Sequence, residues 1–108
     1  MNSINEDKLG KHDIDFSLNI NERYLKTFAH KVEEILKAMT TGRHSPVSVS
    51  GDADKVRAFA KALGLEEKYI KVLAASSGAT PDAMGVRHQL EEAIAEFEKM
   101  TGIKWPVR

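Results

Sequence analysis

Residues 66–75, with the sequence EEKYIKVLAA, decide the fold class of this chain. Counted from Leu65 and Tyr69, their apolar side chains recur at helical spacing, but counted from Ile70 they alternate as on one face of a strand. We favour a strand, because aromatic and β-branched residues are common in strands and because residues 76–78, Ser-Ser-Gly, end the run abruptly. If the stretch is helical instead, the domain becomes mostly helical with a two-stranded ribbon.

A helix is predicted immediately before this stretch, over about residues 53–63. Phe59 and Leu63 recur on its apolar face at helical spacing. Asp52 is placed to cap its start, and Gly64 is placed to end it.

The first half of the chain predicts two strands with a helix between them. Residues 13–20 alternate between apolar and polar side chains, which is the period of a half-buried strand. Residues 22–41 switch to helical spacing, with Asn21 as the N-cap and Gly42 just beyond the C-terminus. Residues 46–50 are a candidate for a short second strand.

The last helix is predicted over residues 82–101, with Thr80 or Asp82 at its start and Gly102 at its end. The whole order is then β-α-β-α-β-α. This order indicates a small two-layer α/β sandwich, of the α+β kind, with about three helices on a short sheet.

The composition narrows the functional classes. The 108 residues support one globular α/β domain over 12–108, after a polar lead-in at 1–11 that we expect to be poorly ordered. The chain has no cysteine, which excludes disulfide scaffolds, thiolate metal sites and cysteine nucleophiles. No apolar run approaches the roughly 18 residues of a membrane span. We expect a cytoplasmic protein.

The charge is balanced, with 16 basic and 16 acidic residues. A dedicated nucleic-acid binder usually has a basic excess, so nucleic acid is a disfavoured partner. A net charge near zero weakens repulsion between copies, which favours self-association and makes a homodimer an open alternative.

Two predicted loops form a candidate ligand site. Each follows a predicted strand and precedes a helix, so both are expected at the carboxyl edge of a parallel sheet, where backbone N–H groups suit an anion or a phosphate. The chain has neither a Walker loop nor a dinucleotide fingerprint. The candidate ligand residues are Ser50, Gly51, Ser76, Ser77, Gly78, Thr80 and Arg87.

No catalytic or cofactor motif is present. The four histidines have no metal-ligand spacing, so no metal and no cofactor are expected. Ser77, His88 and Asp52 can be written as a triad, but the chain lacks the nucleophile elbow that accompanies such a serine. We therefore assign no catalytic residue.

Charged residues recur in the two later helical regions. Lys61, Lys68 and Lys71 are spaced so that they can form one basic patch. Glu91, Glu92, Glu96 and Glu98 are a candidate acidic surface for a partner, but we favour the simpler interpretation that they form a solvated helix face.

Trp105 is the single tryptophan and lies near the C-terminus. It has two interpretations: the ring docks onto the core, which we favour because large aromatic residues are usually buried, or it anchors a partner. The function that we favour is a small non-catalytic binding or regulatory module that acts through protein–protein interaction. The alternatives are a small-ligand or enzyme domain that binds an anion at the two loops and, third, a nucleic-acid-binding domain.

Overall fold

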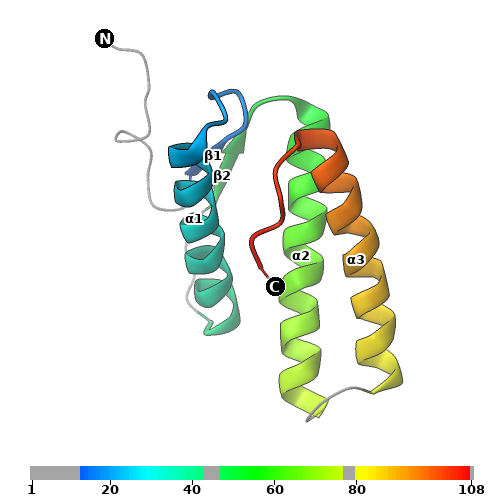
Figure 1. Ribbon diagram of the computed structural model, residues 1–108. Coiled ribbons are helices and arrows are strands. Elements are labelled where there is room, and N and C mark those ends of the chain that lie inside the picture. The colour runs from blue at the N-terminus through cyan, green and yellow to red at the C-terminus, as the bar shows by residue number, and fades with distance from the viewer. Residues whose placement is uncertain (1–12, 43–46, 77–79, 108) are drawn as a thin grey trace.

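Three helices and two short strands make up the part of the chain that the structure, a computed structural model, describes: residues 13–42, 47–76 and 80–107. The predicted lead-in lies outside these residues. In chain order the elements are β1 (Asp13–Asp15), α1 (Glu22–Thr40), β2 (Ser48–Ser50), α2 (Ala53–Ser76) and α3 (Pro81–Thr101) (Figure 1).

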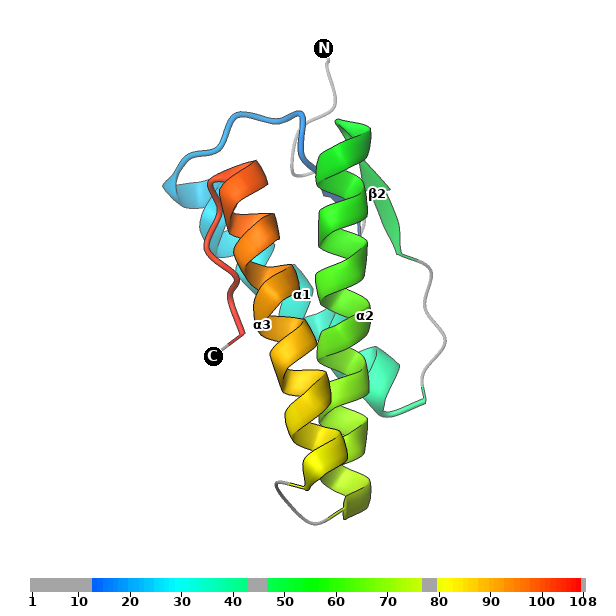
Figure 2. The ribbon, with the colours of Figure 1, turned by 90° about the vertical axis from the view of Figure 1, so that its right-hand side faces the viewer.

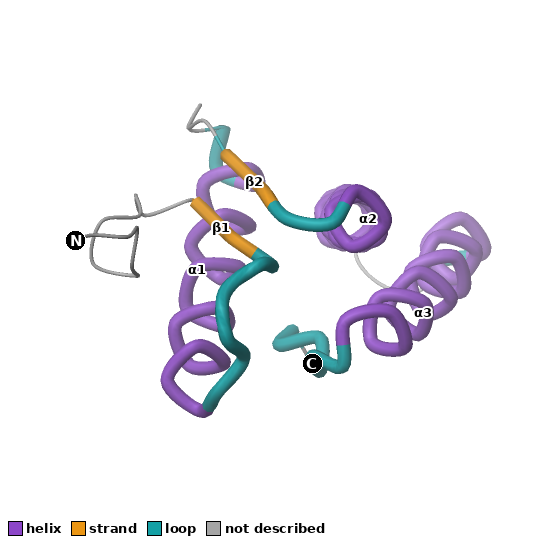
Figure 3. The backbone as a smooth tube through the Cα atoms, turned by 90° about the horizontal axis from the view of Figure 1, so that it is seen from above, coloured by secondary structure: helices purple, strands orange, loops and turns teal. Residues whose placement is uncertain are grey.

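The two strands run parallel, with Ile14 opposite Val49. Because α1 connects them, β1, α1 and β2 form one β-α-β unit, and α1 packs beside the strands in the view along the helical hairpin (Figure 3). The next helix, α2, contacts both α1 and α3, so it lies between the β-α-β unit and α3.

The strand favoured over residues 66–75 is wrong: this stretch is the second half of α2, and the order β-α-β-α-β-α is not formed. The mostly helical alternative with a two-stranded ribbon matches the structure. Gly64 does not end the helix either. A glycine inside a helix costs about 1 kcal/mol relative to alanine. The buried row that runs from Phe59 through Leu63 and Glu66 stays in phase across it, and burying even one large apolar side chain contributes about 1.5–3 kcal/mol.

The first strand is shorter than the alternation of residues 13–20 predicts. The Asp15 Oδ1 atom accepts hydrogen bonds from the Ser17 backbone N–H (2.8 Å) and hydroxyl (2.6 Å), and this turn ends the strand. Phe16 is still buried next to the strand, but Ile20 is 39% exposed. The alternation therefore identified the buried face correctly at its start and wrongly at its end.

The helix ends follow the sequence closely. The side chains of Asn21 and Thr80 accept backbone N–H groups at the starts of α1 and α3, over 2.8 and 3.1 Å. Gly42 and Gly102 have left-handed backbones, with φ of 79° and 74°, just beyond the ends of these helices. These four cap predictions are confirmed.

One aromatic cluster joins the three helices, the residue after β1 and the C-terminal tail. Phe59 of α2 lies at its centre, with ring centroids 5.5 Å from Phe16, 5.8 Å from Phe28, 6.1 Å from Phe97 and 5.9 Å from Trp105. Because these rings come from the β-α-β unit, from α3 and from the C-terminal tail, the cluster ties the two halves of the fold together.

Candidate functional site

The loop between β2 and α2 is occupied by contacts within the chain. The Ser50 carbonyl accepts the Phe16 N–H over 2.9 Å. Gly51 has a φ of +121°, and a Cβ atom there would lie 3.0 Å from the Phe16 Cβ atom. The Asp52 carboxylate accepts the N–H groups of residues 54 and 55 over 3.2 and 3.4 Å. An anion at this helix start would compete with the Asp52 charge.

The second predicted loop lies at the opposite end of α2. Ser76 is the last residue of that helix, Ser77 and Gly78 lie outside the described residues, and Thr80 caps α3. The 24 residues of α2 span about 36 Å between the two loops. The structure therefore does not bring the two loops together.

The predicted ligand site depended on a third strand over residues 66–75, which would have returned the chain to the same sheet edge. Because this stretch is helical, the chain continues away from the sheet instead. Arg87 lies two turns along α3 from Thr80, and its Nε atom donates to the Glu91 Oε2 atom over 3.3 Å.

Trp105 is docked onto its own chain and is 7% exposed. Its indole N–H donates to the Glu66 Oε1 atom (3.0 Å), and its backbone N–H donates to the Glu98 Oε2 atom (2.8 Å). The docking interpretation thus describes this structure: the ring packs against Phe59 and Phe97, with centroids 5.9 and 5.3 Å away. The sequence analysis misses the buried Glu66, because its burial follows from the helical phase of residues 66–75, for which a strand is predicted.

The two histidines within the described residues lie on different helices. His12 and His44 lie outside the described residues, His30 is exposed on α1, and the His88 Nε2 atom lies 3.5 Å from the Glu92 Oε2 atom on α3. Among the residues that the structure describes, no three side chains of the metal-binding types come together.

An open groove lies between α2 and α3, with a volume of about 350 Å³. Its lining residues are Asp54, Arg57, Ala58, Lys61, Glu96 and Met100. In the view of Figure 2 the hairpin of α2 and α3 stands in front, and α1 lies behind it. The hairpin therefore has an outer face that α1 does not cover.

The two helices of this hairpin carry opposite charges. Helix α2 contains five basic and three acidic residues, whereas α3 contains two basic and five acidic residues. Lys68 is seven residues after Lys61, and Glu92 is four residues before Glu96, so each pair shares a helix face. We call Arg57, Lys61 and Lys68 the basic wall, and Glu92 and Glu96 the acidic wall.

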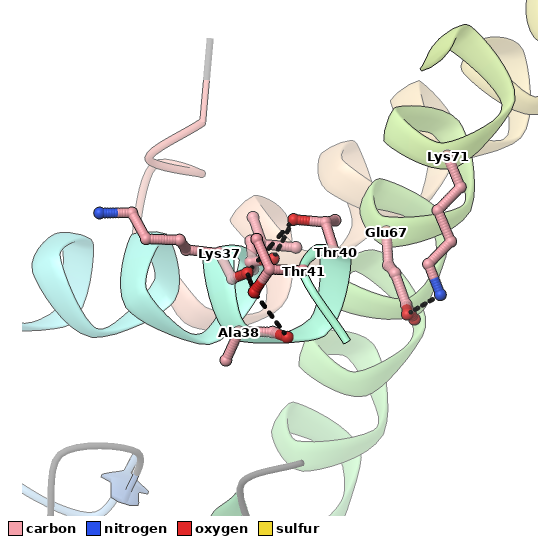
Figure 4. Close-up of polar contacts among 7 residues, drawn as sticks. Lys37, Ala38, Thr40, Thr41, Glu67 and Lys71 are labelled. Carbon is pink, nitrogen blue, oxygen red and sulfur yellow. Dashed lines mark hydrogen bonds and ion pairs between the residues drawn. The ribbon is translucent and has the colours of Figure 1, made fainter. Parts of the chain in front are cut away.

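Lys71, which the sequence grouped with Lys61 and Lys68, makes a separate contact. Its Nζ atom lies 2.8 Å from the Glu67 Oε2 atom (Figure 4). The same view shows the end of α1, where the Thr40 and Thr41 hydroxyls donate to helix carbonyls over 2.8 and 2.7 Å. The predicted basic patch is thus divided, with Lys71 engaged by an acidic neighbour one turn away.

A second groove, of about 370 Å³, separates α3 from the C-terminal tail. Its apolar lining comes mainly from Ile94, Ala95 and Val107, and the side chains of Glu91 and Glu98 complete it beside Trp105. Both carboxylates already have hydrogen-bond partners within the chain, which are Arg87 and the Trp105 backbone. Its acidic residues therefore have less free charge to offer than Glu96 of the first groove, which has no ion-pair partner among the described residues.

Comparison with known proteins adds no identification: no family model, no curated protein and no solved structure matches this chain. Within residues 13–42, 47–76 and 80–107, none of the helices has the length and apolar character that crossing a membrane requires.

Proposed function

We propose that this chain is a non-catalytic protein-binding module, and that it binds through the outer face of the α2–α3 hairpin. The observation that carries the proposal is the open groove between the two helices, with Ala58 and Met100 contributing apolar surface between charged walls. An apolar centre with a polar rim is the usual anatomy of a protein interface.

The size of this face supports the proposal. Helices about 36 and 32 Å long, set about 10 Å apart, present roughly 700 Å² to one side. That area is close to the roughly 800 Å² that each partner buries in a standard protein–protein interface.

The charge pattern favours a protein over a nucleic acid. A phosphate backbone attracted to Lys61 and Lys68 would also approach the carboxylates of Glu92 and Glu96 on the neighbouring helix. A protein surface can present both signs of charge and satisfy both walls. Binding to DNA or RNA that weakens steeply with added salt would contradict this preference.

Site-specific photo-crosslinking tests the proposal. A photoreactive amino acid replaces Gln89, which is exposed on α3, and as a matched control it replaces His30, which is exposed on α1. We expect crosslinks to protein from position 89 in the native cell and far fewer from position 30. Equal crosslinking at both positions, or none at position 89, would reject the hairpin face as the binding surface.

A further inference from the structure

One residue of the basic wall and one of the acidic wall lie at the same level of the hairpin. Lys61 of α2 and Glu96 of α3 line the same groove from its two sides. Neither side chain has an ion-pair partner among the residues that the structure describes, and Lys68 has none either. Lys61 and Glu96 therefore present opposite charges to the open side of the hairpin, at the same level along the helices.

Symmetry decides which partner satisfies both walls. A two-fold axis parallel to the helices would place α2 of one copy over α3 of the other and would keep every residue at its own level. Lys61 of each copy would then lie over Glu96 of the other. An axis across the helices would place α2 over α2, and the basic walls would repel each other.

We propose that the outer face of the hairpin binds a second copy of this chain, with the two-fold axis parallel to α2 and α3. This inference rests on the proposed function, because it names the partner of the same face. The face is complementary to itself only in that arrangement, and the zero net charge of the chain leaves no overall repulsion between copies.

The positions of two glycines on the outer face of the hairpin are consistent with this two-fold dimer. Gly64 lies between Lys61 and Lys68 in α2, and Gly85 lies in α3. Each is exposed, and a Cβ atom added at either would meet no atom within 4 Å. Neither glycine is therefore required by close packing within the described part of the chain, although each weakens its helix. A helix from a second copy would use the space that these positions leave.

Charge reversal of the two walls tests the proposal. The first variant, Lys61→Glu/Lys68→Glu, reverses the charge of the two lysines of the basic wall and leaves Arg57, and the second, Glu92→Lys/Glu96→Lys, makes both walls basic. In sedimentation velocity we expect the native chain to dimerise and each variant alone to be monomeric at the same concentration. An equimolar mixture of the two variants should restore a dimer that contains one copy of each.

A third variant controls for simple attraction between opposite net charges. Lys26→Glu/Lys37→Glu changes the net charge by the same amount as the first variant, on exposed positions of α1. It should still dimerise with itself and should form no heterodimer with the basic variant. A heterodimer there that is as strong as that of the first variant would overturn the two-fold arrangement.

A steric variant tests the same face without a change of charge. Gly64→Leu is accommodated by the single chain, since the site is open, but its side chain would stand between two copies. We expect native circular dichroism and at least a tenfold weaker dimer. A native chain that stays monomeric at roughly millimolar concentration, or a dimer unaffected by Gly64→Leu and by both wall variants, would overturn the proposal.

The crosslinking experiment separates this inference from the proposed function. A product from position 89 with the mass of two copies supports both. A product with a different protein alone would overturn the second-copy inference and leave the binding face in place. The absence of any product at position 89 would reject both.

Discussion

The β-α-β unit and the α2–α3 hairpin are held by different kinds of contact. Contacts within the unit include close-range ones, such as the Asn21 cap and the Asp15–Ser17 turn, each spanning three residues or fewer. The distant contacts differ in kind: parallel strand pairing, with Ile14 opposite Val49, closes the unit, whereas a side-chain hydrogen bond from Trp105 to Glu66, 39 residues earlier, joins the tail to the hairpin. The comparison shows that the short-range signals of both regions can be predicted from the sequence, whereas the distant contacts of both cannot.

The largest expected effect is at the point where the two regions meet. Phe59→Ala removes a fully buried ring that contacts aromatic rings of both regions. We expect the free energy of unfolding to fall by about 3–5 kcal/mol, from lost burial and the cavity left behind. Chemical denaturation at low protein concentration measures this change.

The matched control is Met84→Ala, since that side chain is 64% exposed and should change the free energy of unfolding by less than about 0.5 kcal/mol. If the two regions are one cooperative unit, Phe59→Ala should move the fluorescence of Trp105 and the far-ultraviolet circular dichroism together. Separate transitions would show that the regions unfold independently.

The connection between the regions is the next most sensitive place. Gly51→Ala forces a Cβ atom to within 3.0 Å of the Phe16 Cβ atom and 3.2 Å of the Phe16 nitrogen, at a φ of +121°. Backbone strain of this kind costs about 1–3 kcal/mol, and the close contact adds to it. Thermal unfolding should show a lower melting temperature. An unchanged melting temperature would mean that the loop accommodates the Cβ atom without any loss of stability.

A smaller decrease in the free energy of unfolding is expected for a substitution within the hairpin. Trp105→Phe keeps an aromatic ring in the cluster but removes the N–H that donates to the buried Glu66 carboxylate. Losing one donor to the buried Glu66 Oε1 atom should lower the free energy of unfolding by about 1–3 kcal/mol. Urea denaturation measures it, and Lys104→Ala, at the exposed neighbouring position, is the control.

The sequence predicts the short-range features of both regions better than the distant ones, for a physical reason. The caps at Asn21 and Thr80 and the glycines after α1 and α3 act within one helical turn, so a short stretch of sequence contains the whole signal. The continuation of α2 through residues 66–75 depends on packing against α3 and the tail, which no short window contains. The ligand site assigned to Gly51 and Thr80 failed to assemble for the same reason.

The charged walls were visible in the sequence only as separate helix faces. Lys61 and Lys68 were grouped correctly, as were Glu92 and Glu96, because a seven- or four-residue spacing defines one face of a helix. The groove that Lys61 and Glu96 share cannot be seen while α2 is divided at Gly64. The relation between the two walls requires that both helices be long, antiparallel and in contact, which is a property of the tertiary fold.

The smallest expected effect has the opposite sign and concerns the residue that misled the prediction. Gly64→Ala fills open space in an unbroken helix, so it restricts the unfolded chain and improves helix propensity without a clash. We expect the free energy of unfolding to rise by about 0.5–1 kcal/mol when measured on the monomer at low concentration. The same substitution at Gly51 should lower it, so the two glycines form a matched pair. If Gly64→Ala destabilised the chain instead, a break in α2 at that position would be required for stability, and the continuous hairpin on which both proposals rest would be wrong.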